Sequence, residues 1–374
     1  MLHLAVALDG AGWHPAAWRQ PDARPLELFT ARYWADLVAE AEGGLLDFVT
    51  IEDGLTLQTE GPVQTDRVRG RLDAVLIASR VAPLTRHIGL VPTAIATHTE
   101  PFHVSKAIAT LDYVSGGRAG VRVQVASSAA AAAHFGRRDV QRELLLTEAG
   151  DYIEVLRRLW DSWEDDAEIR DVATGRFVDR DKLHYIDFEG RWFSVKGPSI
   201  TPRPPQGQPI VAALAHAEAA WQLAATSADV AFITPHDAAE VTTIAGRLSE
   251  LRPAAFDPVH VFPDLVVFLA DTADAAAARR RLLEDLVSTE YVSDAEVFVG
   301  TPLQLADLLQ QWHAAGASGF RLRPATLPHD LAQITTGLVP ELQRRELFRD
   351  NYSGATLRDS LGLSRPANRY APAP

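Results

Sequence analysis

The sequence contains no cysteine among its 374 residues. Without thiols, the chain cannot form disulfides, thiolate metal sites, iron–sulfur clusters or a cysteine nucleophile. Basic residues are also scarce: 36 lysine and arginine residues stand against 49 aspartate and glutamate residues, and the formal net charge is −13. Nucleic acids and anionic membranes both require basic surfaces on the proteins that bind them, so this balance argues against both kinds of partner.

Long hydrophobic runs are missing as well. No apolar run approaches the length of about 18 residues that a membrane helix needs. The first ten residues have neither a basic start nor a long apolar stretch, so no secretory signal is evident. Hydrophobic residues still make up 47% of the chain, which is enough for a sizeable core. We therefore expect a globular cytoplasmic protein.

Eight short runs rich in valine, isoleucine, leucine and phenylalanine have the features of strands, because glycine, proline or charged residues bound each of them. They are Leu4–Leu8, Phe48–Ile51, Ile88–Thr93, Gly120–Val125, Ile210–Leu214, Val230–Thr234, Val259–Leu269 and Phe320–Arg323. Helical patterns separate them, which indicates parallel strands joined by right-handed crossovers. Eight such units in a chain of this length predict an α/β fold, a (β/α)8 TIM barrel.

Three of the helical patterns are clear. Leu28–Glu42 and Ala149–Trp163 both carry apolar residues on one face. Leu303–Ala315 follows Thr301, which is a suitable N-cap, and has Pro302 at the first helical position.

Two segments fall outside the repeat. Residues 161–208 begin acidic and end rich in proline, which predicts a long insertion between the fourth helix and the fifth strand. Trp192 and Phe193 lie in this insertion and need burial, so we expect it to be ordered. Residues 1–340 are expected to form the barrel, and residues 341–374 to form a C-terminal extension that packs on the barrel or on a partner subunit.

Working residues of a TIM barrel lie at the carboxyl ends of its strands. The polar residues at those positions are Asp9, Glu52, Asp53, Thr93, Thr97, His98, Gln124, Ser127, Ser128, His216, Thr234, His236, Arg321 and Arg323. No HExxH motif, GxSxG motif or glycine-rich nucleotide-binding loop follows a strand. The patterns therefore argue against a metal site, a serine hydrolase and a dinucleotide or P-loop site, and they indicate only a barrel enzyme with a largely metal-free pocket.

Longer stretches carry a family resemblance. They include Asp47–Gly54 at the second strand, Leu111–Gly120 before the fourth, Arg191–Pro198 in the insertion, and Thr356–Arg358 with Leu361–Leu363 near the C-terminus. In this order, and from end to end, the chain resembles the bacterial luciferase-like flavin monooxygenases. The branch that it resembles includes nitrilotriacetate, alkane and dibenzothiophene-sulfone monooxygenases.

The resemblance implies a two-component monooxygenase on a (β/α)8 barrel. Such an enzyme receives reduced FMN as a co-substrate from a separate NAD(P)H:flavin reductase, uses O2, and oxygenates a small organic substrate. The resemblance also implies a homodimer or a higher oligomer. Two alternatives stay open: an F420-dependent oxidoreductase on the same barrel, and a catalytically silent relative that binds a small molecule or a subunit.

The same resemblance suggests site residues. Asp53 and Thr97 match the family's flavin-contacting aspartate and threonine. The cofactor site is expected to comprise Asp53, Thr97, Gln124, Ser127 and His216, and the substrate contacts Glu52 and His98. No catalytic acid or base is nominated, because the chemistry of the family resides in the flavin.

The chain also departs from the family at three places. At the fourth strand, where the family has Gly-Trp-Asn, Gly120 is followed by Val121, Arg122, Val123 and Gln124, and Gln124 is a candidate to replace the Asn amide. The family's His-Asp-x-Arg-Tyr motif falls on Arg142–Leu146, and its phosphate-contacting serine falls near His216. Each lost donor is worth about 1.5–3 kcal/mol to a buried phosphate, so we expect weakened FMN affinity.

Overall fold

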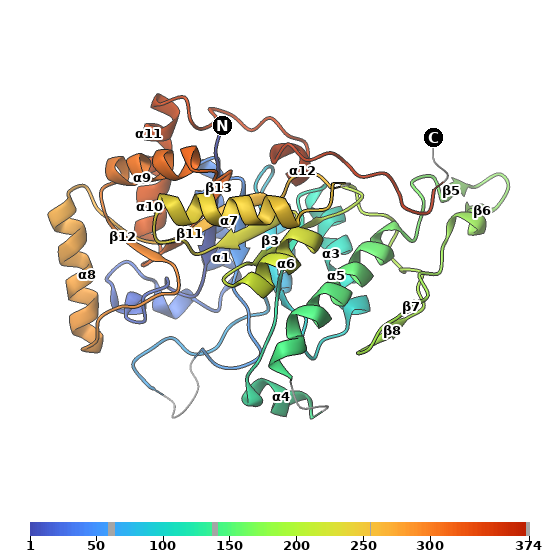
Figure 1. Cartoon of the computed structure of the whole chain (residues 1–374), viewed down its shortest axis with the longest axis horizontal. Coiled ribbons are helices and arrows are strands. Elements are labelled where there is room, and N and C mark those ends of the chain that lie inside the picture. Colours follow the sequence, from blue (N-terminus) through green and yellow to red (C-terminus); the bar gives the residue numbers. More distant parts are fainter. Residues whose placement is uncertain (59–63, 137–140, 255, 372–374) are drawn as a thin grey trace.

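Eight parallel strands form a closed barrel in the computed structural model, which describes residues 1–58, 64–136, 141–254 and 256–371 (Figure 1). In order around the barrel they are β1 (His3–Leu8), β2 (Phe48–Ile51), β3 (Gly89–Ile95), β4 (Gly120–Gln124), β9 (Ile210–Leu214), β10 (Val230–Ile233), β11 (His260–Leu269) and β13 (Gly319–Pro324). Pairing of β10 with β11 and of β13 with β1 closes the ring. The predicted TIM barrel is confirmed, and each predicted strand matches within two residues at either end.

Helices surround the barrel (Figure 1). They are α1 (Ala31–Gly43), α2 (Ala74–Val81), α3 (Pro101–Ser115), α4 (Ala129–Phe135), α5 (Leu145–Asp161), α6 (Glu218–Ser227), α7 (Ala238–Leu251), α8 (Ala273–Val287), α9 (Pro302–Ala314), α10 (His329–Gln333) and α11 (Val339–Arg344). The three predicted helices are α1, α5 and α9, with boundaries shifted by up to four residues. Thr301 caps α9 as predicted, in a reciprocal capping box with Gln304.

The sequence did not predict β12 (Glu296–Gly300), which lies outside the barrel. The ten residues of β11 make it longer than the barrel wall. Its first part, His260–Pro263, pairs with β10, and its last part, Leu265–Leu269, pairs in parallel with β12. The helix α8 connects β11 to β12, so β12 and α8 form one additional strand–helix unit beyond the eight of the barrel.

Aromatic side chains fill the N-terminal half of the barrel lumen. The rings of Phe48, Phe232 and Phe262 lie with their centroids 5.7–6.3 Å apart. Leucines from the C-terminal segment, in and just after α12 (Leu357–Ser360), belong to the same buried cluster. A β-carbon on Gly89 would come within 2.6 Å of Leu357, so the contact leaves no room for a side chain there. The C-terminal segment therefore closes the N-terminal end of the barrel.

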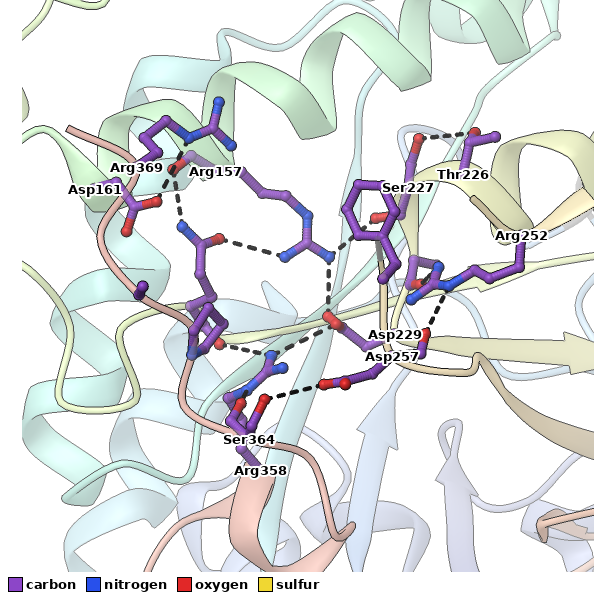
Figure 2. Close-up of a pocket in the computed structure, with 15 residues that line it drawn as sticks. Arg157, Asp161, Thr226, Ser227, Asp229, Arg252, Asp257, Arg358, Ser364 and Arg369 are labelled. Carbon is purple, nitrogen blue, oxygen red and sulfur yellow. Dashed lines mark hydrogen bonds and ion pairs between the residues drawn. The ribbon is translucent and has the colours of Figure 1, made fainter. Parts of the chain in front are cut away.

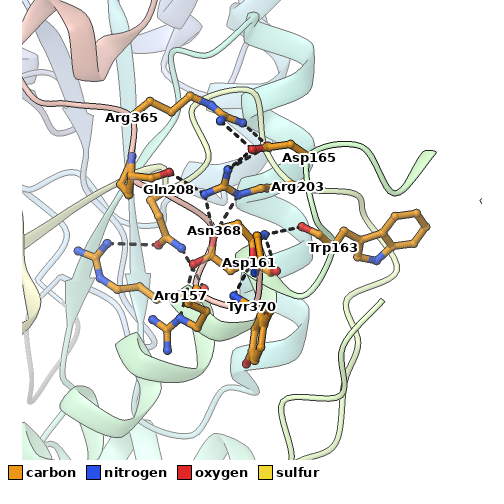
Figure 3. Close-up of polar contacts among 12 residues, drawn as sticks. Arg157, Asp161, Trp163, Asp165, Arg203, Gln208, Arg365, Asn368 and Tyr370 are labelled. Atoms are coloured by element: carbon orange, nitrogen blue, oxygen red, sulfur yellow. Dashed lines mark hydrogen bonds and ion pairs between the residues drawn. The ribbon is translucent and has the colours of Figure 1, made fainter. Parts of the chain in front are cut away.

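Beyond α12 the C-terminal segment runs to the insertion (Figures 1 and 3). Arg203, in the insertion, donates from Nη2 to the carbonyl of Pro366 at 2.8 Å and from Nε to Asp161 Oδ1 at 3.1 Å. Asn368 donates to the carbonyls of Asp161 and Trp163, both at 2.8 Å. These contacts join the last described residues to the end of α5.

A cavity of about 410 Å³ lies beneath this segment (Figure 2). Its charged groups already have partners inside the protein. The Asp229 carboxylate accepts from Arg157 at 3.0 Å and lies 3.5 Å from Arg358, and Arg252 donates to the carbonyls of Ala225 and Ala228. These arginines join strand and helix ends to the C-terminal segment, so the cavity belongs to the framework of the fold.

The insertion contains two small antiparallel hairpins. They are β5 (Glu168–Asp171) with β6 (Arg176–Val178), and β7 (Phe188–Glu189) with β8 (Ser194–Val195). Phe193 packs edge-to-face on Tyr152 of α5, with ring centroids 6.2 Å apart. Within the described ranges, no helix is both long and apolar enough to cross a membrane.

The link between insertion and C-terminal segment gives a stability prediction. Arg203→Met should lower the free energy of unfolding by about 3 kcal/mol or more, because it leaves the buried Asp161 carboxylate with less compensation. Arg365→Met is the matched control. Arg365 pairs with Asp165, and both side chains are about half exposed, so the loss of unfolding free energy should stay under about 1 kcal/mol. Urea denaturation of the two variants measures the difference, and equal losses would contradict the inferred role of Arg203.

Candidate active site

A cavity of about 220 Å³ opens between the carboxyl ends of β2, β3 and β4. We call it the β2–β4 cavity. Three of the predicted cofactor residues line it: Asp53 after β2, and Gln124 and Ser127 at the end of β4. This is the end of the barrel at which TIM-barrel enzymes place their working residues.

Asp53 organises the loop on one side of this cavity. Its Oδ1 accepts a hydrogen bond from the Gly54 amide at 2.7 Å, and its Oδ2 accepts one from the amide of Ala74, the first residue of α2, at 3.0 Å. Burial raises the pKa of Asp53, although these two amides act in the opposite direction. The carboxylate therefore ties the β2 loop to the start of α2.

Thr97 lies behind the other side of the cavity. Its side chain is buried, and Oγ1 accepts a hydrogen bond from the Ala126 amide at 3.0 Å. That bond holds the loop that carries the exposed Ser127, while Ser128 caps α4 by accepting from the Ala131 amide. Thr97 thus shapes the wall of the β2–β4 cavity without lining it.

Glu52, a predicted substrate contact, faces the barrel lumen. Its side chain is 9% exposed. One carboxylate oxygen bonds Arg122, and the other lies 3.6 Å from Nη1 of Arg321. Its role toward a substrate stays a prediction.

An ionic network fills the C-terminal half of the lumen. Arg321 donates two hydrogen bonds to the buried Asp264, at 2.6 and 2.5 Å, and its guanidinium lies 4.1 Å from the ring centroid of Phe232. Arg323 bonds the same Asp264 and donates to Asp294 at 2.6 Å. Burial acts to raise the pKa of Asp264, but the two arginines outweigh it and lower that pKa, so the carboxylate is charged.

The other predicted contacts lie apart from the β2–β4 cavity. His216 has a side chain 32% exposed, with Nδ1 3.4 Å from Asp294 Oδ2, and burial lowers its pKa despite that neighbour. His98 is buried with a positive φ of 70°, and its ring stacks on Phe135 of α4 at 5.3 Å. Roles for these two histidines remain predictions.

A second cavity, also of about 220 Å³, lies beside the loop that follows β1. We call it the β1 cavity. Gln58 and Arg71 line both cavities, so the two are neighbours. Arg71 is held by a bidentate pair with Asp9, at 3.1 and 2.7 Å. The sequence analysis missed Arg71 because it follows a long loop and not a strand end.

His14 also borders the β1 cavity, and the sequence did not single it out as a site residue. Its side chain is buried, and Nδ1 accepts a hydrogen bond from the Ala16 amide at 3.1 Å. Burial lowers its pKa to about 4, so the ring is neutral at neutral pH and Nε2 carries the proton. Across the described residues, Nε2 has no hydrogen-bond partner. The position of His14 just after β1 was the signal that could have identified it.

Metal ligands are not gathered anywhere in the part of the chain that the structure describes: no group of three or more His, Asp or Glu side chains could hold an ion. Side chains with carboxylate, amide, hydroxyl and guanidinium groups line the two cavities.

Known proteins resemble this chain along nearly all of its length. The chain is 32% identical to N-acetyl-S-(2-succino)cysteine monooxygenase of Bacillus subtilis (strain 168), over 99% of this chain and 98% of the relative. It is 31% identical to nitrilotriacetate monooxygenase component A of Aminobacter aminovorans, over the same shares of 99% and 98%. It is 34% identical to one of the subunits of pristinamycin IIA synthase of Streptomyces pristinaespiralis, over 81% of this chain and 82% of the relative.

The fold has a close counterpart among solved structures. The crystal structure of a long-chain alkane monooxygenase superposes with a TM-score of 0.86, at 23% identity, over 96% of this chain and 95% of that one. A family model described as luciferase-like monooxygenase matches residues 11–287. With this match and relatives above 30% identity from end to end, the chain belongs to the luciferase-like monooxygenase family.

Proposed function

We propose that this protein is a flavin-dependent monooxygenase that uses reduced FMN and O2 to oxygenate a small organic substrate. A separate NAD(P)H:flavin reductase would supply the reduced FMN. Family membership supports this proposal, as does a relative that is named component A of its monooxygenase. The observation that carries it is the β2–β4 cavity, which opens at the catalytic end of the barrel.

The groups that line the β2–β4 cavity fit the ring of a flavin. Gln124 and Ser127 offer an amide and a hydroxyl, and the carbonyls and ring nitrogens of a flavin include acceptors for such donors. Asp53, in the cavity wall, and Thr97, behind it, would hold the loops that form this surface. When bound, reduced FMN would supply the electrons with which O2 is activated.

The β1 cavity is the proposed substrate site. Because it shares Gln58 and Arg71 with the β2–β4 cavity, a small molecule there would lie beside the flavin. Trp13, which lines this cavity, would cover the apolar part of that molecule. Trp13 is itself fixed, since Nε1 donates to the Ala7 carbonyl at 3.0 Å and the Arg323 guanidinium lies 4.6 Å from its ring centroid.

A second candidate function is that of a subunit that associates with a related chain and does not itself bind flavin. Two observations favour it. Arg122, which pairs with Glu52, lies on the fourth strand where the resemblance leads us to expect Gly-Trp-Asn. In addition, the relative at 34% identity is named as one subunit of a synthase. Whether the chain forms a homodimer or a higher oligomer stays a prediction.

An anaerobic titration with reduced FMN separates these functions. If the leading proposal is right, the purified protein will bind reduced FMN saturably, as followed by flavin fluorescence or absorbance. F420 is titrated in parallel. Preferential binding of F420 would move the function to hydride transfer without O2, and failure to bind either compound would favour the subunit function.

The role of Thr97 can be tested with two substitutions. Thr97→Val removes the acceptor of the buried Ala126 amide, which should cost about 1–3 kcal/mol of stability. It should also raise the dissociation constant for reduced FMN, because the released loop carries Ser127. Thr97→Ser keeps the hydroxyl and serves as the control, with affinity near that of the wild type. Equal affinity in all three proteins would remove Thr97 from the site.

The protonation of His14 gives a pH prediction. The unfolded chain takes up a proton near pH 6.5, whereas folded His14 resists it down to about pH 4, so stability falls as the pH drops through this window. The contribution of one group is about 1.4 kcal/mol per pH unit. His14→Gln, which keeps an N–H donor, should flatten the decline in urea denaturation by that slope. His236→Gln, at an exposed histidine, should leave the slope unchanged.

A further inference from the structure

Arg122 is held in one orientation inside the barrel. Its side chain is 2% exposed. Nε donates to Thr93 Oγ1 at 3.0 Å, and Nη2 bonds both Glu52 and Gln124 Oε1, the latter at 2.7 Å. The contacts come from the neighbouring strands β2 and β3 and from β4 itself, so the guanidinium is fixed from several directions.

The contact with Arg122 settles which way the Gln124 amide points. A guanidinium carries only donors, so the group of Gln124 that meets it must be the carbonyl oxygen. The amide nitrogen, Nε2, is then turned away from Arg122. Gln124 is partly exposed and lines the β2–β4 cavity, and among the described residues its Nε2 donates no hydrogen bond.

We infer that Arg122 is a positioning residue: by occupying the Gln124 carbonyl, it makes Gln124 a fixed N–H donor for a hydrogen-bond acceptor of the ligand in the β2–β4 cavity. This inference rests on the proposed function, in which that acceptor is a carbonyl or nitrogen of the flavin ring. A ligand that offers a donor at this point would meet another donor and be disfavoured.

The charge on Arg122 keeps this arrangement in place at ordinary pH. Burial lowers the pKa of Arg122 to about 10, with Glu52 opposing that shift, so the guanidinium stays protonated around neutrality. Other charged groups of the lumen are also balanced: Glu52 faces Arg321 as well as Arg122, and Arg321 is paired with Asp264.

The direct test replaces the donor while keeping the shape. In Gln124→Glu, one carboxylate oxygen accepts from Arg122, and the other presents an acceptor to the cavity. The dissociation constants for reduced FMN and for reduced riboflavin, which lacks the phosphate, should both rise at least about tenfold. An equal rise for the two compounds locates the effect at the ring. The apoprotein should melt no lower than the wild type, because the hydrogen bond to Arg122 then joins two opposite charges.

A double-mutant cycle tests whether Arg122 acts through Gln124. Arg122→Met is combined with Glu52→Gln, so that the lumen loses one charge of each sign. This pair of substitutions should raise the dissociation constant for reduced riboflavin several-fold when Gln124 is present, and should have no further effect in a Gln124→Ala background. A purely structural role for Arg122 would give the same loss in both backgrounds.

The outcomes separate this inference from the proposed function. Saturable flavin binding that is unchanged by Gln124→Glu would overturn the inference and leave the proposed function standing. No flavin binding by the wild type would overturn the proposed function and the ligand assignment together. The Arg122–Gln124 contact is then tested in the apoprotein. Gln124→Glu is introduced into the wild type and into the Arg122→Met variant, and the thermal midpoint is measured in each background. An equal shift of the midpoint in both backgrounds would refute the contact.

Discussion

Two buried ion pairs inside the barrel are the constraint on which the rest of the structure depends. Arg321 and Asp264 are fully buried, and Arg323 shares the same carboxylate. Removing one member of such a pair leaves an uncompensated charge at a cost of about 3–5 kcal/mol. Together with Arg122, Glu52 and Asp294, these groups form a set of three positive and three negative charges, so their charges balance one another.

The N-terminal end of the barrel is closed by different means, and this also directs function to the opposite end. Leucines of the C-terminal segment complete the apolar cluster beneath the ionic network, and Arg358 brings the same segment onto the buried Asp229. The cavity of about 410 Å³ lies here, yet its arginines already bond carboxylates and carbonyls of the framework. Working residues of TIM barrels lie at the other end, where the β2–β4 cavity opens.

Local pattern was sufficient to predict the fold, because each barrel strand is an apolar run between breakers. Local pattern was insufficient to predict β12, which pairs with the C-terminal part of β11, Leu265–Leu269. The start of α5 was misplaced because Leu144 offers no side-chain cap. At the site, strand ends identified Asp53, Gln124 and Ser127 as lining residues. The partners of Glu52 and Arg122 could not be predicted, because they come from strands far apart in the sequence and meet only when the barrel closes.

The lumen and the mouth of the barrel are chemically coupled by the geometry of a strand. Residues two apart face the same side, so Arg122 in the lumen lies directly below Gln124 at the mouth. Because Arg122 occupies the carbonyl oxygen of Gln124, it determines that Gln124 offers its N–H group to the cavity. A substitution among the buried charges can therefore change the ligand preference of the cavity without touching the ligand. In this chain, Glu52 neutralises the charge of Arg122 on the fourth strand, and the same guanidinium nitrogen orients the Gln124 amide toward the cavity.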